Sequence, residues 1–175
     1  MQNVKFDIGL IFAILNGRVS AAINRQLSRN FKKYEVNITP EQWTVLIYLW
    51  EKDGVTQQEL CNATYKDKPS MTRLIDNMEK LNLVVRISSK TDRRTNLIHL
   101  TKIGRDLEHR SRFIANKTLK EALKGLSTEE LTISQEVLRK VFRIEYFLPS
   151  ILSGDTFLST GNLRYRHGLP VFLVF

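Results

Sequence analysis

The spacing of apolar residues predicts a long helix near the start of the chain. Over residues 5–34, apolar side chains recur at steps of three and four, as they do along one face of an α-helix. A helix of this length with one apolar face needs a partner surface. The apolar stripe consists of Leu10, Ile11, Ile14, Leu15, Val19, Ile23, Leu27 and Phe31.

Two capping boxes predict two shorter helices. The stretch Thr39-Pro40-Glu41-Gln42 combines a capping threonine, a proline suited to the first helical position and a glutamine at capping-box spacing. The helix that it opens ends near residues 53–54. The stretch Thr56-Gln57-Gln58-Glu59 repeats the same spacing and predicts a short helix through residues 60–63.

The next predicted helix, residues 69–81, has two different faces. Its inward stripe comprises Met71, Leu74, Ile75, Met78 and Leu81. The side chains that face away are Ser70, Thr72, Arg73, Asp76, Asn77 and Lys80. This outer face can hydrogen-bond to base edges and phosphates.

After residue 82 the period changes from helical to extended. Residues 83–88 and 96–100 are rich in β-branched and apolar residues and predict two strands. The segment between them, residues 90–95, is polar and turn-like. The chain therefore forms a hairpin here with a basic tip.

Two further helices are predicted near the C-terminus. Thr101 caps a helix that reaches about residue 126, and a capping box beginning at Ser127 opens a helix that ends before Pro149. Residues 149–175 show no regular period. They form either a loosely ordered extension or an arm packed on a partner subunit.

This order of elements predicts a mainly α-helical fold with a small antiparallel β-hairpin, a winged helix-turn-helix with long terminal dimerisation helices. We expect one unit over residues 1–148, in which residues 38–100 form the DNA-binding lobe. The outer helices, residues 5–34 and 101–148, are not needed to bind DNA. Their apolar stripes are better explained as the interface of a homodimer.

The charge favours a polyanionic partner. The chain has 27 Lys and Arg against 18 Asp and Glu, a formal net charge of +9. Each phosphate that a cation neutralises releases condensed counterions, which favours nucleic-acid binding. The alternative is a protein that is merely basic.

The rest of the composition indicates a cytoplasmic protein without a membrane segment. Cys61 is the single cysteine, so no intrachain disulfide can form, which fits a reducing compartment. The apolar run of residues 8–15 has no basic segment before it and is too short to span a membrane. We therefore predict neither a signal peptide nor a membrane anchor.

No motif predicts an enzyme, a metal site or a cofactor. The sequence has no glycine-rich phosphate loop, no H-E-x-x-H and no G-x-S-x-G. His99, His109 and His167 are scattered, with no second ligand at metal-binding spacing.

Two sets of residues have alternative interpretations. Cys61 is either a buried structural cysteine, which its place beside Leu60 favours, or a redox sensor. Trp43, Tyr48 and Trp50 either pack in the core, which we favour, or line a ligand pocket.

The motifs resemble the MarR family. The resemblance lies in TPEQWTVLIYLWEKDGVTQQEL, KPSMTRLIDNMEKLNLVVR and TDRRTNLIHLTKIG, and it covers about residues 5–147. It implies a dimer with intertwined terminal helices that binds double-stranded, pseudo-palindromic operators. It also implies release by a small aromatic or anionic effector.

The resemblance also implies roles for single residues. It places Arg94 in the minor groove, oriented by an ion pair with Asp92, whereas Arg93 fits a phosphate contact. Ser70, Thr72 and Arg73 match base- and backbone-contacting positions. The basic backbone contacts are expected at Lys66, Lys68 and Lys90. The predicted DNA-binding residues are Lys68, Pro69, Ser70, Thr72, Arg73, Asn77, Lys90, Asp92, Arg93 and Arg94.

The sequence departs from the usual pattern of the family at two positions. Asn82 stands where such proteins often have glycine, and Pro69 lies in the first turn of the recognition helix. The proline leaves the register of the base contacts open. The sequence predicts a DNA-binding transcription regulator, and the resemblance implies that it is a repressor released by an effector. The alternative is a winged-helix module that binds another protein, with incidental basic charge.

Overall fold

The structure is a computed structural model that describes residues 8–92 and 94–152. In chain order the elements are α1 (Ile8–Lys33), α2 (Pro40–Glu51), β1 (Val55–Thr56), α3 (Gln57–Thr64), α4 (Lys68–Lys80), β2 (Val84–Ser88), β3 (Asn96–Leu100), α5 (Lys102–Ala122) and α6 (Thr128–Leu152). The described residues divide into two compact units, residues 8–122 and residues 123–152. The beginning of the predicted first helix, residues 5–7, lies outside the described residues, as do Arg93, His167 and the rest of the C-terminal segment beyond residue 152.

The predicted helix starts at α2 and α3 are confirmed. Thr39 and Gln42 exchange both bonds of a capping box: the Gln42 N–H donates to Thr39 Oγ1 over 3.2 Å, and the Thr39 N–H donates to Gln42 Oε1 over 2.9 Å. Thr56 and Glu59 make the same pair of bonds at the start of α3. These local signals are reliable because each satisfies backbone N–H groups that have no partner within the helix.

The predicted two-stranded hairpin proves to be a sheet of three strands. Its order is β1-β3-β2, and both pairings are antiparallel. The register pairs Val84 with Leu100 at the base of the hairpin and Ser88 with Asn96 at its end. Strand β1 was not predicted because two residues are too few to show a period.

Several element ends differ from the prediction. α4 begins at Lys68 rather than Pro69, because Asp67 accepts the Ser70 N–H and is the N-cap. α5 ends at Ala122 rather than near residue 126, and Gly125 then takes a positive φ of 96°. Leu81, expected in the inward stripe of α4, caps the helix and is 39% exposed.

The last helix, α6, also departs from the prediction at its end. Ser127 and Glu130 form the expected capping box at its start. The helix was predicted to stop before Pro149, but it continues to Leu152. A proline removes one backbone hydrogen bond and crowds the preceding turn, and in the last turn of a helix few further bonds depend on it. Among the α6 residues whose side chains are described, the exposed apolar ones are Ile133, Val137, Leu138 and Val141.

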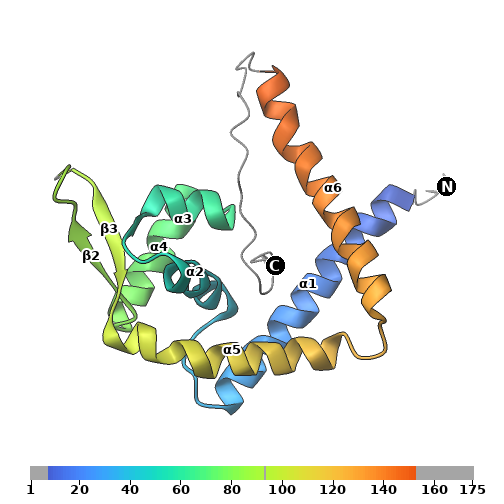
Figure 1. The fold of residues 1–175 in the computed structure, drawn as a ribbon, viewed down its shortest axis with the longest axis horizontal. Helices are drawn as coiled ribbons and strands as arrows, with labels where there is room; N and C mark the ends of the chain where they lie inside the picture. The colour runs from blue at the N-terminus through green and yellow to red at the C-terminus, as the bar shows by residue number, and fades with distance from the viewer. Residues whose placement is uncertain (1–7, 93, 153–175) are drawn as a thin grey trace, which may run out of the picture. The chain divides into compact units, whose positions relative to one another are not determined.

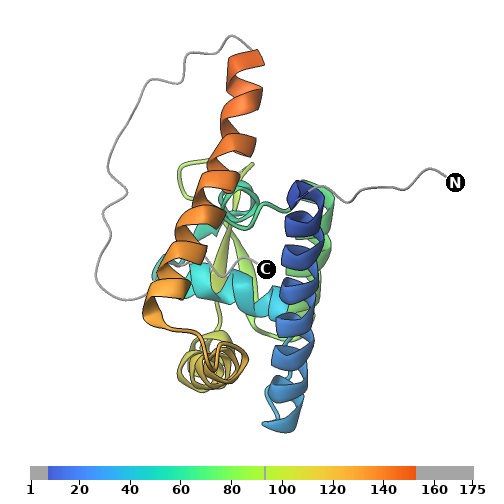
Figure 2. The same cartoon turned by 90° about the vertical axis from the view of Figure 1, so that its right-hand side faces the viewer.

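Residues 8–122 share one hydrophobic core. Figure 1 shows α2, α3 and α4 gathered beside the sheet, with the β2–β3 hairpin extending past them. The C-terminal half of α1 contributes Leu27 and Phe31 to this core, whereas the N-terminal half of α1 leaves its apolar residues exposed. Figure 2 views α5 nearly end-on and shows how α1 passes beside it. Within the described residues, no helix has the length and apolar character needed to cross a membrane.

α5 is attached closely to the sheet and to α2. A Cβ on Gly104 would lie 2.1 Å from the Leu83 carbonyl oxygen, so only glycine allows this approach. The Gly104 carbonyl accepts a bond of 3.0 Å from Trp50 Nε1. Asp53 accepts bonds from the Leu100 N–H over 2.8 Å and from Arg105 Nη2 over 2.6 Å. Partial burial raises the pKa of Asp53, but these donors together hold it below its ordinary value.

The end of α4 explains the departure at Asn82. Asn82 has a φ of 54°, the left-handed conformation in which helices commonly terminate. Glycine adopts it most easily, and asparagine tolerates it better than most residues. The substitution therefore preserves the turn between α4 and β2.

Candidate nucleic-acid interface

The start of α4 is held by its N-cap. The Asp67 carboxylate accepts a bond of 2.8 Å from the Ser70 N–H and one of 2.7 Å from Ser70 Oγ. These two bonds lower the pKa of Asp67. Pro69 fits here because a residue in the first turn has no intrahelical acceptor for an N–H. The hydroxyl of Ser70, predicted to contact bases, is therefore directed to Asp67.

The second predicted hydroxyl of α4 is also occupied. Thr72 Oγ1 donates to the Lys68 carbonyl over 2.9 Å and accepts a bond of 2.7 Å from Gln57 Nε2. Gln57 lies at the start of α3, so Thr72 joins the two helices of the helix-turn-helix. Its main structural role is to fix α4 against α3.

Three side chains of the outward face of α4 have no internal partners among the described residues. Arg73, Asn77 and Lys80 are exposed, and among the described residues their side chains make no hydrogen bond or ion pair. Pro69 and Lys68 extend this exposed face toward the N-terminus of the helix. The opposite face, Met71, Leu74, Ile75 and Met78, is buried. The prediction of two distinct faces is confirmed, except that Leu81 is exposed and that Thr72 and Asp76 of the predicted outer face are half-buried.

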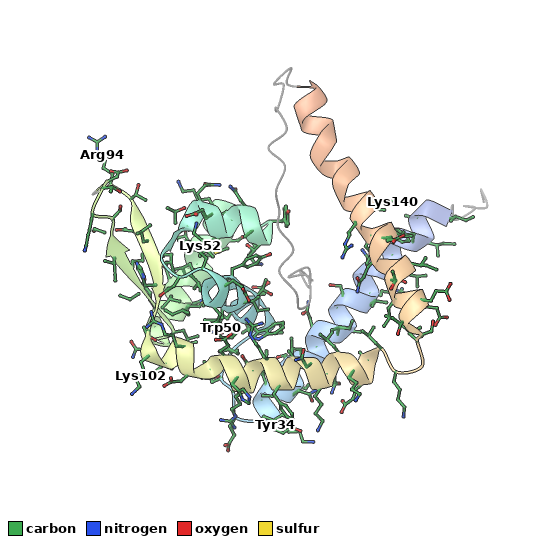
Figure 3. The ribbon with its side chains drawn as sticks, viewed as in Figure 1. Tyr34, Trp50, Lys52, Arg94, Lys102 and Lys140 are labelled. Atoms are coloured by element: carbon green, nitrogen blue, oxygen red, sulfur yellow. The ribbon has the colours of Figure 1, made fainter. Side chains whose placement is uncertain are left out.

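The tip of the wing is a turn organised by Asp92. Its carboxylate accepts a bond of 2.7 Å from Thr95 Oγ1 and one of 3.0 Å from the Arg94 N–H. These bonds lower the pKa of Asp92. Figure 3 shows the Arg94 side chain projecting from the tip, away from the sheet. Lys90 is exposed on the same turn, and Arg93 lies outside the described residues.

The structure does not contain the ion pair that was expected between the side chains of Asp92 and Arg94, within the residues that it describes. Within the described residues the Asp92 carboxylate binds the backbone N–H of Arg94, and no ion pair joins the two side chains. A carboxylate two residues before an N–H closes a local turn, and this geometry competes with a bond to the guanidinium. Arg94 is therefore positioned through its backbone, and its side chain has no hydrogen-bond or ion-pair partner among the described residues.

The other basic residues of the lobe differ in how far they are engaged. Lys66, expected to contact the DNA backbone, has its Nζ atom 3.3 Å from Glu41 Oε1. For Lys68 and Lys90, no side-chain ion pair exists within the described part of the chain. The interface thus brings together Lys68, Pro69, Arg73 and Asn77 on α4, and Lys90 and Arg94 on the wing.

Sequence reasoning missed two residues that shape α4. Asp67 is the N-cap, and its signal was an aspartate directly before Lys-Pro and three residues before Ser70. Gln57 was noted only as part of a capping box, and its bond to Thr72 depends on tertiary placement. Such a contact has no sequence signature.

The two open interpretations are resolved toward packing. Cys61 is 5% exposed, and burial raises the pKa of its thiol, which makes it a poor redox sensor. Trp43 is 6% exposed and packs on Phe31 with ring centroids 6.2 Å apart, and Trp50 is bonded to Gly104. In the part of the chain that the structure describes, no three His, Cys, Asp or Glu residues are grouped to hold a metal ion.

Comparison with known proteins agrees with this geometry. Residues 36–95 match the model of the MarR family. The HTH-type transcriptional regulator YsmB from Bacillus subtilis is 31% identical over 121 residues, which cover 69% of this chain and 82% of YsmB. The chain belongs to the MarR family. It is therefore a transcription regulator of the winged-helix type rather than an enzyme.

Solved structures of MarR-type proteins have the same fold. A cysteine-to-serine mutant of E. coli MarR, complexed with operator DNA, aligns with a TM-score of 0.71 at 23% identity over 78% of this chain and 99% of that chain. BpsR from Bordetella bronchiseptica, whose DNA binding is regulated by 6-hydroxynicotinic acid, aligns with a TM-score of 0.67 at 20% identity over 81% of this chain and 96% of that chain. These similarities confirm the predicted fold class.

The cap of α4 predicts a specific response to acid. The bonds from Ser70 depress the pKa of Asp67 in the folded state. A carboxylate of this kind stabilises the fold above its unfolded pKa of about 3.9, and the stabilisation is lost as pH falls through the lower folded pKa. We expect Asp67→Ala to lower the melting temperature at pH 7 and to reduce its further decline below about pH 4.

The measurement is thermal unfolding followed by circular dichroism between pH 7 and pH 3. Asp106→Ala serves as the control, because Asp106 is exposed on α5 and makes no bond among the residues described. An Asp67→Ala curve that runs parallel to the wild-type curve at every pH would contradict a capping role for the ionised carboxylate.

Proposed function

We propose that this MarR-family protein is a homodimeric repressor in the cytoplasm that binds pseudo-palindromic operator DNA and is released by a small aromatic anion. The observation that carries the DNA-binding part is the set of exposed α4 side chains, Arg73, Asn77 and Lys80, that have no partner among the described residues, together with the exposed Arg94 of the wing. The E. coli MarR structure in complex with operator DNA supports the same use of this fold.

Arg73 and Asn77 are the base-reading residues that we assign. They lie one helical turn apart on the exposed face of α4, and neither side chain has a partner among the described residues. Arginine forms two bonds to guanine in the major groove, and asparagine forms two to adenine. Ser70 and Thr72 already have intramolecular partners and contribute less to base discrimination.

The wing supplies interactions of a different kind. Arg94 projects from the tip, and a narrow minor groove attracts an arginine through its negative potential. Lys68 and Lys90 are exposed near the two elements and suit phosphates. Arg93 remains a predicted phosphate contact. A dimer would carry twice the net charge of +9, which favours binding to a polyanion.

Exposed apolar surface supports the dimer. In α1, the side chains of Leu10, Ile11, Ile14, Leu15 and Val19 are between 38% and 54% exposed. Contiguous apolar surface of this kind marks an interaction site. α6, considered by itself, has a second set of exposed apolar residues. Burial of both sets against a second copy would remove this surface from water.

Support for an effector comes from BpsR, whose DNA binding responds to an aromatic carboxylate. A ligand that binds the free dimer more tightly than the DNA-bound dimer must shift the protein off its operator. We therefore assign the effector to the class of small aromatic anions.

The DNA-binding proposal predicts different effects for the two arginines. Arg73→Ala should weaken binding to the operator by ~1–3 kcal/mol per half-site and have a smaller effect on random DNA. Arg94→Ala should weaken binding to both DNAs. It should also flatten the salt slope by about one unit for each phosphate that a subunit no longer neutralises.

The experiment is a salt titration with a duplex selected by the wild-type protein from a random library, and with unselected duplex. Arg29→Ala is the matched control, since it removes an exposed arginine from α1, outside the winged lobe. If the wild-type protein selects no sequence, or both variants bind like the control, the lobe does not bind DNA in this way and the protein-interaction alternative gains support.

The dimer proposal predicts the effect of a charge on the α1 stripe. Leu15 is 54% exposed in the single chain, and Leu15→Asp should convert the dimer to a monomer at micromolar concentration because the carboxylate would be buried unpaired. Sedimentation velocity measures the change. Asn16→Asp adds the same charge one residue along, off the stripe, and should leave the dimer intact. A Leu15→Asp protein that stays dimeric would exclude this face as the interface.

The effector proposal predicts that 6-hydroxynicotinic acid or salicylate at millimolar concentration lowers operator affinity. Fluorescence anisotropy with a labelled operator duplex measures the affinity with and without each compound. Uncharged benzamide controls for non-specific effects of an aromatic ring. A panel of aromatic carboxylates that leaves affinity unchanged would count against release by this class of ligand.

A further inference from the structure

The wing and the recognition helix are joined by one arginine. Arg86 lies in β2, and its Nη2 atom is 2.7 Å from Asp76 Oδ1 on α4. Its Nη1 atom donates to Glu79 Oε2 on the same helix. The Arg86 side chain is only 23% exposed, so the guanidinium lies largely between the strand and the helix.

The backbone of Arg86 takes part in the same interaction. β2 is an edge strand, because the sheet order is β1-β3-β2. The Arg86 N–H donates to Glu79 Oε1 over 3.0 Å. The two oxygens of Glu79 therefore bind the backbone and the side chain of one residue, which fixes the strand in position as well as the side chain.

Arg86 lies between the buried base of β2 and its exposed end near the wing tip. Val84, at the base of β2, is buried in the core, whereas Ile87 and Ser88, nearer the tip, are exposed. Within the described residues, Arg86 is the residue nearest the wing tip that bonds β2 to α4. The turn that carries Arg94 begins three residues later, and Arg73 lies one turn before Asp76 on α4.

We propose that Arg86 is a positioning residue that holds the wing at a set place relative to α4, so that Arg94 and Arg73 reach their DNA sites together. The inference rests on the proposed contact of the wing with DNA. Arg86 itself need not contact DNA. Its guanidinium also neutralises two carboxylates of α4 that would otherwise repel phosphates near the interface.

The energetics favour a structural role over a solvated charge. Arg86 combines bonds to two carboxylates with partial burial, and bonds from a guanidinium to carboxylates are among the stronger ones in proteins. Removal of the guanidinium would leave Asp76 and Glu79, three residues apart on one helix face, as neighbouring negative charges without their partner. The wing would then be free to shift relative to α4.

The test is a double-mutant cycle between Arg86 and Arg94, measured as affinity for the selected duplex. In the wild-type background we expect Arg94→Ala to weaken binding by about tenfold. In an Arg86→Gln background the same change should cost less than about threefold, because the displaced wing no longer delivers Arg94 to the groove. An equal loss of affinity in both backgrounds would overturn the proposal.

Arg112→Gln is the matched control. Arg112 also binds two carboxylates, with Nε 2.9 Å from Glu108 Oε1 and Nη2 3.3 Å from Glu51 Oε1, but these lie on α5 and α2. In the Arg112→Gln background, Arg94→Ala should still weaken DNA binding by about tenfold. A reduced effect there too would show that general destabilisation, rather than wing position, weakens the coupling. All variants are assayed at least 15 °C below their measured melting temperatures.

Hydrogen exchange of the free protein separates this proposal from the proposed function. In Arg86→Gln we expect amide exchange over residues 84–88 to be at least tenfold faster than in wild type and in Arg112→Gln. If exchange there is unchanged, Arg86 does not hold the wing and the inference is wrong. Another outcome is faster exchange in Arg86→Gln while Arg94→Ala, made in the otherwise wild-type protein, leaves DNA affinity unchanged. That result would support the positioning role of Arg86 and contradict the proposed contact of the wing with DNA.

Discussion

The burial of one face of α4 determines what the rest of the DNA-binding lobe can do. Met71, Ile75 and Met78 are almost completely inaccessible to solvent and pack with residues of α2, α3 and the sheet. Because an α-helix has a fixed angular spacing, anchoring these positions orients every other residue of α4. Arg73 and Asn77 point outward for this reason. A core substitution that rotated α4 would therefore redirect Arg73 and Asn77, the residues proposed to read bases, without changing either of them.

Local signals allowed most of the fold to be predicted. Capping boxes at Thr39, Thr56 and Ser127 placed three helix starts, because the bonds involved lie within four residues. The apolar stripe of α1 and the change of period after residue 82 did the same for the first helix and the hairpin. β1 was missed since its pairing with β3 joins residues more than 40 positions apart. The extension of α6 through Pro149 was missed because proline weakens a helix without always ending it.

The candidate site was predictable as a surface and less so as a set of hydrogen bonds. Helical periodicity correctly separated Arg73 and Asn77 from the buried stripe. It could not reveal that Ser70 bonds to Asp67 or that Thr72 bonds to Gln57, since short hydroxyl side chains choose their partners from the folded surroundings. The same limit applies to Asp92, which binds the backbone of Arg94 instead of its side chain. Sequence patterns identify which way a side chain faces, but the tertiary structure determines whether its polar atoms are already bonded within the protein.

The close approach of Gly104 to Leu83 has a consequence for signal transmission. Together with the bonds of Asp53 to Leu100 and Arg105, it attaches the start of α5 to the base of the wing at several points. α5 has 21 residues and is therefore about 30 Å long. Because one end of α5 is attached to the lobe, a tilt of the helix by about 5° displaces its other end by roughly 3 Å. A rotation of α5 by this amount would thus carry the base of the wing with it, and the displacement is comparable to one base-pair step of a duplex.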